Sequence, residues 1–195
     1  MKIFVVLAHP RSDSFNAALC EALCHGIHKA GHETDVADLC ADGFDPVLRG
    51  TELNTLGTGP PLPDVASYQQ RILQAQAMAF IFPVWWFGVP AILKGFVDRV
   101  FQEEFAFRFT SRGQVKGLLQ HEKALVACTA GMSASLYRLF RFGRPLEKTF
   151  VDWTLKICGI RRVRYVIFHD VVNAGESTRA GYLKEMQRLG RRYFR

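Results

Sequence analysis

Hydrophobic residues along this chain fall into two alternating patterns, short apolar runs and amphipathic stretches of helical period. Residues 2–8 form a continuous run of β-branched and apolar side chains, which is typical of a strand covered on both faces. Residues 14–30 then carry leucine and isoleucine at four-residue spacing, and Gly31 follows them. This pattern predicts a helix that ends at the glycine.

The same alternation continues along the rest of the chain. Further strands are predicted at residues 33–39, 79–82, 123–129 and 163–168. Further helices are predicted at residues 66–77, 90–101, 145–157 and 177–193. Residues 44–58 show no clear period, and the glycines and prolines of residues 57–63 predict a loop.

Strands that alternate with helices five times predict an α/β fold with a parallel sheet and helices on both of its faces. Five strands favour the order 2-1-3-4-5, in which the ligand crevice opens at the carboxyl ends of strands one, three and four. The segments that follow those strands should therefore carry the chemistry. No repeat or linker divides the chain, so we predict one domain over residues 1–195.

Charge changes this interpretation little. The formal net charge is +7, and 49% of the residues are hydrophobic, as in an ordinary globular protein. The basic residues are spread over several predicted elements without a nucleic-acid recognition motif, so we predict no nucleic-acid partner. No apolar run approaches the roughly 18 residues that span a bilayer, which predicts no integral membrane segment.

The five cysteines are an odd number, and no secretory signal precedes the first strand. We therefore predict reduced thiols and a cytoplasmic location. Cys20 and Cys24 stand at helical spacing beside His25 and His28, a composition that could bind a metal. Neighbours on a helix point in different directions, so we predict two core side chains and no metal site.

The segment after the first strand is rich in Ser and Asp and leads directly into a helix. Free backbone N–H groups and the positive end of the helix dipole at such a turn can hold a phosphate. The side chains of Ser14 and Asn16 add donors, and Arg11 adds charge. The alternative is an ordinary helix cap made by Ser14.

The segment after the third strand places Trp85, Trp86 and Phe87 in a row between Pro83 and Pro90. The prolines stiffen the segment, and three consecutive aromatic side chains cannot all be buried together. A rigid aromatic loop at a sheet crevice suits stacking against a flat heterocycle, although a hydrophobic plug or subunit contact would use the same residues. After the fourth strand, the small residues 129–135 allow close approach of backbone N–H groups to a ligand.

Taken together, these segments resemble the NAD(P)H:quinone oxidoreductases of the DT-diaphorase type. The resemblance rests on residues 7–9, 14–16 and 129–137, and above all on the run Trp-Phe-Gly-Val-Pro-Ala at 86–91. It implies a flavodoxin-like three-layer sandwich and a short, bacterial-type member of the family. It also implies a flavin-dependent enzyme that passes a hydride from NADPH or NADH to a quinone-like acceptor by a ping-pong mechanism, usually as a homodimer.

The resemblance further implies which residues contact the flavin. Its phosphates would be held by His9, Ser14, Phe15 and Asn16. Its ring system would pack on Pro83, Val84, Trp86 and Phe87. Its pyrimidine side would be lined by Thr129, Ala130, Gly131 and Met132. Glu176 and Arg179 match a pair that contacts the adenylate half of FAD in some relatives, which favours FAD over FMN.

The acceptor side departs from the family pattern. Tyr137 is kept and is the predicted catalytic donor, but Gly143 stands where the animal enzymes carry an active-site histidine. Phe107 and Phe109 replace two tyrosines that wall the acceptor pocket. We hypothesise that an arginine next to the glycine, Arg141 or Arg144, supplies the charge that the missing histidine would provide.

Other functions remain open on the sequence alone. A flavin-binding redox carrier would share the fold, as would a regulatory subunit of a potassium-efflux system. The sequence does not decide the natural acceptor, and arginines near the pocket favour NADPH only slightly over NADH.

Overall fold

The computed structural model describes residues 1–54, 56–57 and 59–195. Its centre is a parallel sheet of five strands in the order β2-β1-β3-β6-β7, which confirms the predicted order 2-1-3-4-5. The strands are β1 (Lys2–Leu7), β2 (Glu33–Asp38), β3 (Ala77–Pro83), β6 (Lys123–Thr129) and β7 (Arg162–Phe168).

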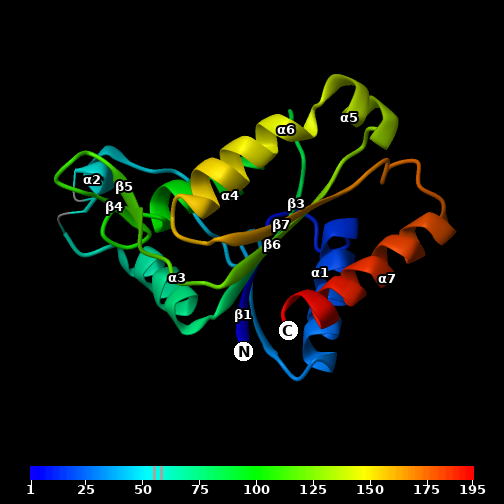
Figure 1. Cartoon of the computed structure of the whole chain (residues 1–195), viewed down its shortest axis with the longest axis horizontal. Helices are drawn as coiled ribbons and strands as arrows, with labels where there is room; N and C mark the ends of the chain where they lie inside the picture. Colours follow the sequence, from blue (N-terminus) through cyan, green and yellow to red (C-terminus); the bar gives the residue numbers. More distant parts are fainter. Residues whose placement is uncertain (55, 58) are drawn as a thin grey trace.

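Helices cover both faces of this sheet and complete the three layers (Figure 1). One face is covered by α1 (Phe15–Lys29) and α7 (Glu176–Tyr193). The other face is covered by α3 (Pro63–Gln74), α4 (Ala91–Val100) and the π-helix η1 (Glu147–Lys156). Shorter helices are α2 (Gly50–Leu53), α5 (Ala134–Phe140) and α6 (Gly143–Leu146).

Burial of the strands follows their place in the sheet. Every residue of the two central strands β3 and β6 is buried, as expected for strands covered on both faces. The edge strand β7 instead alternates, with Arg162 and Arg164 exposed. Charges on an edge strand discourage pairing with another sheet.

The two helices of the first face cross with their backbones in direct contact. A Cβ atom on Gly26 of α1 would collide with the Gln187 carbonyl group, and one on Gly190 of α7 would collide with the Leu23 carbonyl group. Neither glycine has a positive φ, so the close approach itself requires the absence of a side chain.

A buried arginine anchors the opposite face. Arg99 is 2% exposed, and its Nε lies 2.9 Å from a carboxylate oxygen of Glu52. Its Nη1 donates to Asp64 at 2.7 Å and to the Asp45 carbonyl oxygen at 2.6 Å. The guanidinium also lies 5.3 Å from the centre of the Phe44 ring. One side chain on α4 thus fixes α2 and the start of α3.

Several predicted boundaries differ from the structure. The helix predicted at 66–77 begins at Pro63, because proline is well suited to the first helical position. The loop predicted at 57–63 is correspondingly shorter, and its position 58 lies outside the described residues. The aperiodic stretch 44–58 contains the four-residue helix α2, and its positions 55 and 58 are also outside the described residues.

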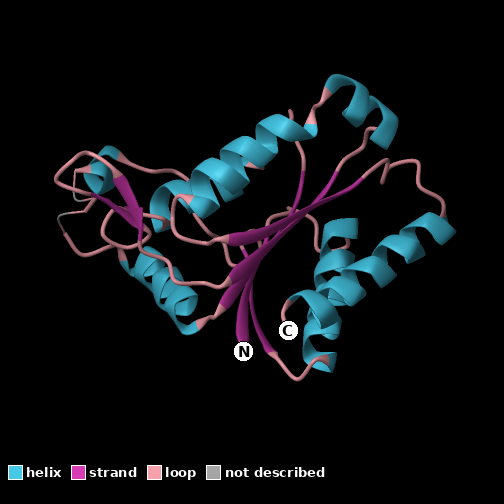
Figure 2. Cartoon of the chain, in the orientation of Figure 1, coloured by secondary structure: helices cyan, strands magenta, loops and turns pink. Residues whose placement is uncertain are grey.

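Two parts of the structure were missed. A small antiparallel hairpin, β4 (Phe107–Phe109) and β5 (Val115–Gly117), projects beside α2, and strands of three residues leave no readable alternation (Figure 2). The helix predicted at 145–157 is split into α6 and η1, and α5 precedes it. Leu136, Leu139 and Phe140 of α5 stand at the helical spacing i, i+3, i+4, so the sequence held a signal that the prediction overlooked; all three are exposed in the structure.

Candidate functional site

The three segments predicted to carry the chemistry meet at the carboxyl ends of β1, β3 and β6. The Asn16 side chain donates to the Thr129 hydroxyl at 3.0 Å, and both residues are buried. The Val84 N–H donates to the Thr129 carbonyl oxygen at 2.8 Å. Thr129 therefore holds the first and second segments to the third, and all three form one wall.

The first segment caps α1 in the expected way. The Ser14 hydroxyl accepts from the Ala17 N–H at 3.2 Å, so the alternative of an ordinary cap is realised. The N–H groups of Phe15 and Asn16 at the first turn have no partner in the described part of the chain. These two donors form part of the positive end of the helix dipole and remain available to an anion.

Two polar side chains of this segment are already engaged. Arg11 makes a two-pronged ion pair with Asp13, at 2.9 Å for both contacts, so its predicted positive charge is locally offset. Asn16 is 4% exposed and uses its amide on Thr129. The backbone, more than these side chains, offers the free donors.

His9 is oriented by the same turn. Its Nδ1 accepts the Arg11 N–H at 3.0 Å, and a backbone N–H can only donate. The same Nδ1 lies 3.3 Å from the Arg11 carbonyl oxygen, so both backbone groups of Arg11 hold this side of the ring. The ring lies 6.0 Å from that of Trp85, which places His9 between the first and second segments.

The second segment is a tight two-residue turn with an unusual backbone. Trp85 and Gly88 exchange hydrogen bonds at 3.2 and 3.0 Å, and the residues between them, Trp86 and Phe87, have φ of +50° and +61°. Such turns normally use Asn or Gly, because a bulky side chain in this region costs about 1–3 kcal/mol. The Trp86 side chain is nevertheless 96% exposed. Strain without burial points to a function for the ring rather than to folding.

The third segment presents free backbone donors. The Ala130 N–H is used on Phe168 at 2.9 Å, whereas the N–H groups of Gly131 and Met132 have no partner among the described residues. A Cβ on Gly131 would meet only Val172, at an ordinary 3.4 Å. Packing within the chain does not require a glycine there, but a ligand at close range would.

A row of aromatic rings links the second segment to α5. The Phe87 and Phe142 ring centroids are 4.5 Å apart, those of Phe142 and Tyr137 are 6.0 Å apart, and those of Tyr137 and His169 are 4.8 Å apart. Tyr137 is buried, and burial raises the pKa of its hydroxyl. Tyr137 is therefore protonated at neutral pH and can donate a hydrogen bond.

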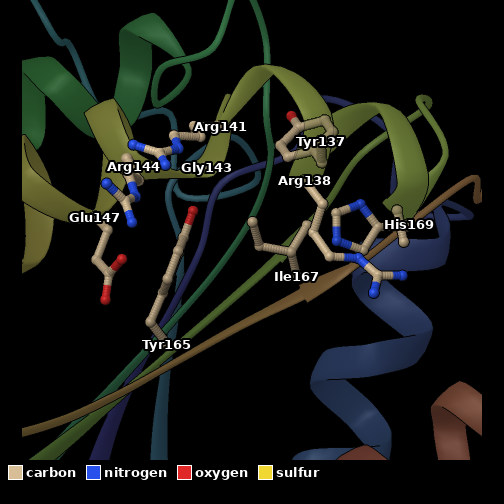
Figure 3. Close-up of a pocket in the computed structure, with 10 residues that line it drawn as sticks. Tyr137, Arg138, Arg141, Gly143, Arg144, Glu147, Tyr165, Ile167 and His169 are labelled. Carbon is tan, nitrogen blue, oxygen red and sulfur yellow. The ribbon is translucent and has the colours of Figure 1, made fainter.

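A pocket of about 580 Å³ lies between α5, α6 and β7 (Figure 3). It contains Tyr137, Gly143 and both arginines proposed to replace the missing histidine, Arg141 and Arg144. It also contains Tyr165, which sequence analysis missed. Alternating positions 163, 165 and 167 on β7 face this side of the sheet, so the strand's period of two was the available signal.

Glu176 and Arg179 do not form a pair in the structure. The Arg179 guanidinium donates to the Val171 carbonyl oxygen at 3.1 Å and lies 5.9 Å from the Phe15 ring centre. Glu176 is exposed at the first turn of α7. Arg179 therefore sits beside the first segment, while Glu176 points into open space at the same edge.

Phe107 and Phe109 lie far from the other predicted site residues. Both are on the hairpin at one end of the molecule, whereas α5, with Tyr137, is at the opposite end (Figure 1). Phe109 is 56% exposed. One copy of the chain therefore does not bring these phenylalanines and Tyr137 into a single pocket.

Cys20 lies in the core against α7, with Cys24 half-buried one turn later. Within residues 1–54, 56–57 and 59–195, no three His, Cys, Asp or Glu side chains are grouped to hold a metal ion. Over the same residues, no helix has the length and apolar character to cross a membrane.

Comparison with known proteins identifies the class. A model of the flavodoxin-like fold family matches residues 1–190, so the chain belongs to this family. The structure superimposes with a TM-score of 0.90 on an NAD(P)H:quinone oxidoreductase from Methanothermobacter marburgensis, at 30% identity over 100% of this chain and 98% of that one.

Sequence relatives point to the same branch. An NAD(P)H oxidoreductase of Haemophilus influenzae, described as uncharacterised, is 31% identical over 88% of this chain and 85% of its own length. The NAD(P)H dehydrogenase [quinone] 1 of Cavia porcellus is 30% identical over 96% of this chain and 77% of its own. The predicted resemblance to NAD(P)H:quinone oxidoreductases is confirmed.

Proposed function

We propose that this chain is a flavin-dependent NAD(P)H oxidoreductase that transfers two electrons, as a hydride, to quinone-like acceptors. The observation that carries the proposal is the meeting of a phosphate-type cradle, an exposed aromatic turn and a glycine-rich loop at one sheet edge. Crevices at this place in parallel sheets bind nucleotides. The names of the sequence relatives and of the structural neighbour support the same chemistry.

The residues present fit a flavin. Free N–H groups at Phe15 and Asn16 suit its phosphates, since a helix N-terminus attracts anions. The exposed ring of Trp86 and the half-exposed ring of Phe87 suit its flat ring system. Free N–H groups at Gly131 and Met132 suit the polar edge of the pyrimidine.

When bound, a flavin accepts a hydride from the reduced nicotinamide and delivers it to the acceptor. The protein's part is to position the ring and to stabilise charge that develops near its pyrimidine edge. Tyr137 remains protonated at neutral pH and is the proposed donor. His9, whose Nδ1 is held by the Arg11 backbone, is the proposed side-chain donor at the phosphates.

We propose FAD in preference to FMN. Arg179 leaves the first turn of α7 and packs on Phe15, whose own N–H belongs to the phosphate cradle. A nucleotide that extends beyond the first phosphate would run towards this corner, where Glu176 and Arg179 flank the α7 N-terminus. A single phosphate would not reach them.

A homodimer would complete the acceptor pocket. Phe107 and Phe109 project on the hairpin away from Tyr137 of the same copy, so a pocket walled by all three needs a second copy. We propose that each copy lends its hairpin to the other. A cytoplasmic location stays a prediction.

The test begins with the purified protein. We expect flavin absorbance in the visible bands, FAD on mass analysis of the released cofactor, and oxidation of NAD(P)H that depends on an added quinone. A carrier would instead hold flavin without catalysing this oxidation. Protein that remains colourless and unliganded after incubation with excess FAD and FMN would refute the proposal.

A further inference from the structure

Three arginines line the pocket between α5, α6 and β7 that Tyr137 shares with the proposed flavin crevice. Arg141 and Arg144 lie on one side, and Arg138 lies beside His169 on the other (Figure 3). Glu147 is the single acidic residue of the lining, so the pocket has an excess of two positive charges.

These guanidinium groups have no partner within the described residues. No hydrogen bond or ion pair from the part of the chain that the structure describes holds the side chains of Arg138, Arg141 or Arg144. Exposed arginines elsewhere, such as Arg191 and Arg192, also lack a partner among the described residues, but these three differ in lining one cavity together. Three unpaired charges around one cavity repel one another, and a bound anion would remove that cost.

The backbone at Arg141 gives an independent sign. Arg141 ends α5 with a φ of +56°, in the left-handed conformation that usually takes glycine or asparagine. The side chain is exposed and makes no contact that stabilises the fold. Folding alone would favour glycine at this position, so the strained arginine points to a role for its guanidinium outside folding.

The floor of the pocket is suited to an organic ligand. Tyr165 and Ile167 rise from β7 between the arginines (Figure 3). The Nδ1 atom of His169 is buried without a hydrogen-bond partner in the described part of the chain. At about 580 Å³ the cavity is within the roughly 300–1,000 Å³ typical of small-molecule sites.

We infer that this pocket binds the phosphate monoester on the adenosine ribose of NADPH, and so selects NADPH over NADH. The inference rests on the proposed function, because it requires the nicotinamide to reach the flavin beside Tyr137. Arginine binds phosphate oxygens in pairs, and an arginine is the usual means of accepting a ribose 2′-phosphate. That phosphate is the only charged group that distinguishes the two donors.

A different role for the same arginines makes a different prediction. If Arg141 or Arg144 only stabilised charge on the reduced flavin, removing that arginine would lower kcat/KM for NADPH and for NADH by the same factor. A role in binding the pyrophosphate, which both donors carry, would also affect them equally. The ratio of kcat/KM for NADPH to that for NADH separates these roles from recognition of the 2′-phosphate.

The decisive variant is Arg141→Gly in the flavin-loaded protein. Glycine removes the charge but suits the left-handed backbone, so the thermal midpoint should stay equal or rise. We expect the NADPH to NADH ratio of kcat/KM to fall about tenfold, and to fall similarly in Arg144→Ala. Arg192→Ala, which removes an exposed charge at the far end of α7, is the matched control and should leave the ratio unchanged.

A binding measurement makes the test independent of turnover. In calorimetry, adenosine 2′,5′-diphosphate should bind the wild-type protein at least tenfold more tightly than adenosine 5′-diphosphate, and Arg141→Gly should abolish the difference. Equal binding of the two nucleotides, or an unchanged donor ratio in Arg141→Gly, would overturn the inference. Neither result would affect the oxidoreductase assignment, which falls only if quinone-dependent oxidation of both donors is absent.

Discussion

Substitution of Trp86 should change the stability of the flavin-free protein and its affinity for flavin in opposite directions. Its side chain is 96% exposed, so the ring contributes little to packing. Its φ is +50°, so the backbone at this residue is strained. We expect Trp86→Asn to stabilise the flavin-free protein and to weaken flavin binding. Asparagine tolerates the left-handed conformation that a bulky residue resists.

The magnitude follows from the same two observations. With 96% of the side chain exposed, about 10 of roughly 250 Å² is buried, worth about 0.25 kcal/mol at 25 cal/mol per Å². A bulky residue at positive φ costs about 1–2 kcal/mol, of which asparagine recovers a part. We therefore expect a gain of about 0.5–1 kcal/mol in the free energy of unfolding.

The same substitution should weaken flavin binding. Loss of an aromatic ring that stacks on the flavin should raise the flavin Kd about tenfold, which corresponds to about 1.4 kcal/mol. Urea unfolding of the flavin-free protein and a fluorescence titration with flavin measure the two effects separately.

A matched variant isolates the backbone contribution. Trp86→Gln removes the same ring but does not favour a positive φ, so it should weaken flavin binding without stabilising the flavin-free protein. A loss of stability in Trp86→Asn, or an unchanged flavin Kd in both variants, would show that the strained turn does not serve the flavin.

Three further predictions concern the scaffold. Arg99→Met should lower the free energy of unfolding by about 3–5 kcal/mol in urea, because it strands a buried carboxylate, and a loss below about 1 kcal/mol would contradict this. Thr129→Val should cost about 1–3 kcal/mol by calorimetry, because the buried Asn16 amide loses its acceptor, whereas a neutral result would mean that the two segments are held otherwise. Although burial opposes it, hydrogen bonds from arginines and nearby cations lower the pKa of Asp35 and of Asp64 in the folded state. Their stabilisation is present at neutral pH and is lost as the pH falls through these lowered values, so denaturant unfolding should show stability decreasing below about pH 4, and Asp35→Asn should reduce that slope.

The sheet and its loops were predictable from the sequence because their signals are local and strong. The apolar run at residues 2–8 predicted a strand covered on both faces, observed as Lys2–Leu7, and residues 123–129 were predicted with the bounds observed. The strand order then fixed which three segments share one edge of the sheet. The Ser14 cap needed only the identity of one residue before an apolar period.

What the sequence could not reveal depends on tertiary contacts. Nothing in the sequence indicated that the Asn16 amide has a partner, and only the fold brings the Thr129 hydroxyl to 3.0 Å from it. The positive φ of Trp86 could not be predicted either, because bulky residues rarely adopt this backbone conformation. The helical spacing of Leu136, Leu139 and Phe140 was present in the sequence, but their exposure and the pocket behind α5 depend on how α5 lies against β7.

The glycine crossing of α1 and α7 has a consequence for how variation can accumulate in this chain. Where carbonyl groups of one helix touch the Cα hydrogens of the other, even a methyl group at Gly26 or Gly190 must push the helices apart. The amino ends of the same helices flank the proposed phosphate cradle, with Arg179 laid across Phe15. A substitution at either glycine, remote from any ligand, should therefore lower the free energy of unfolding and, by moving α1 against α7, also weaken nucleotide retention.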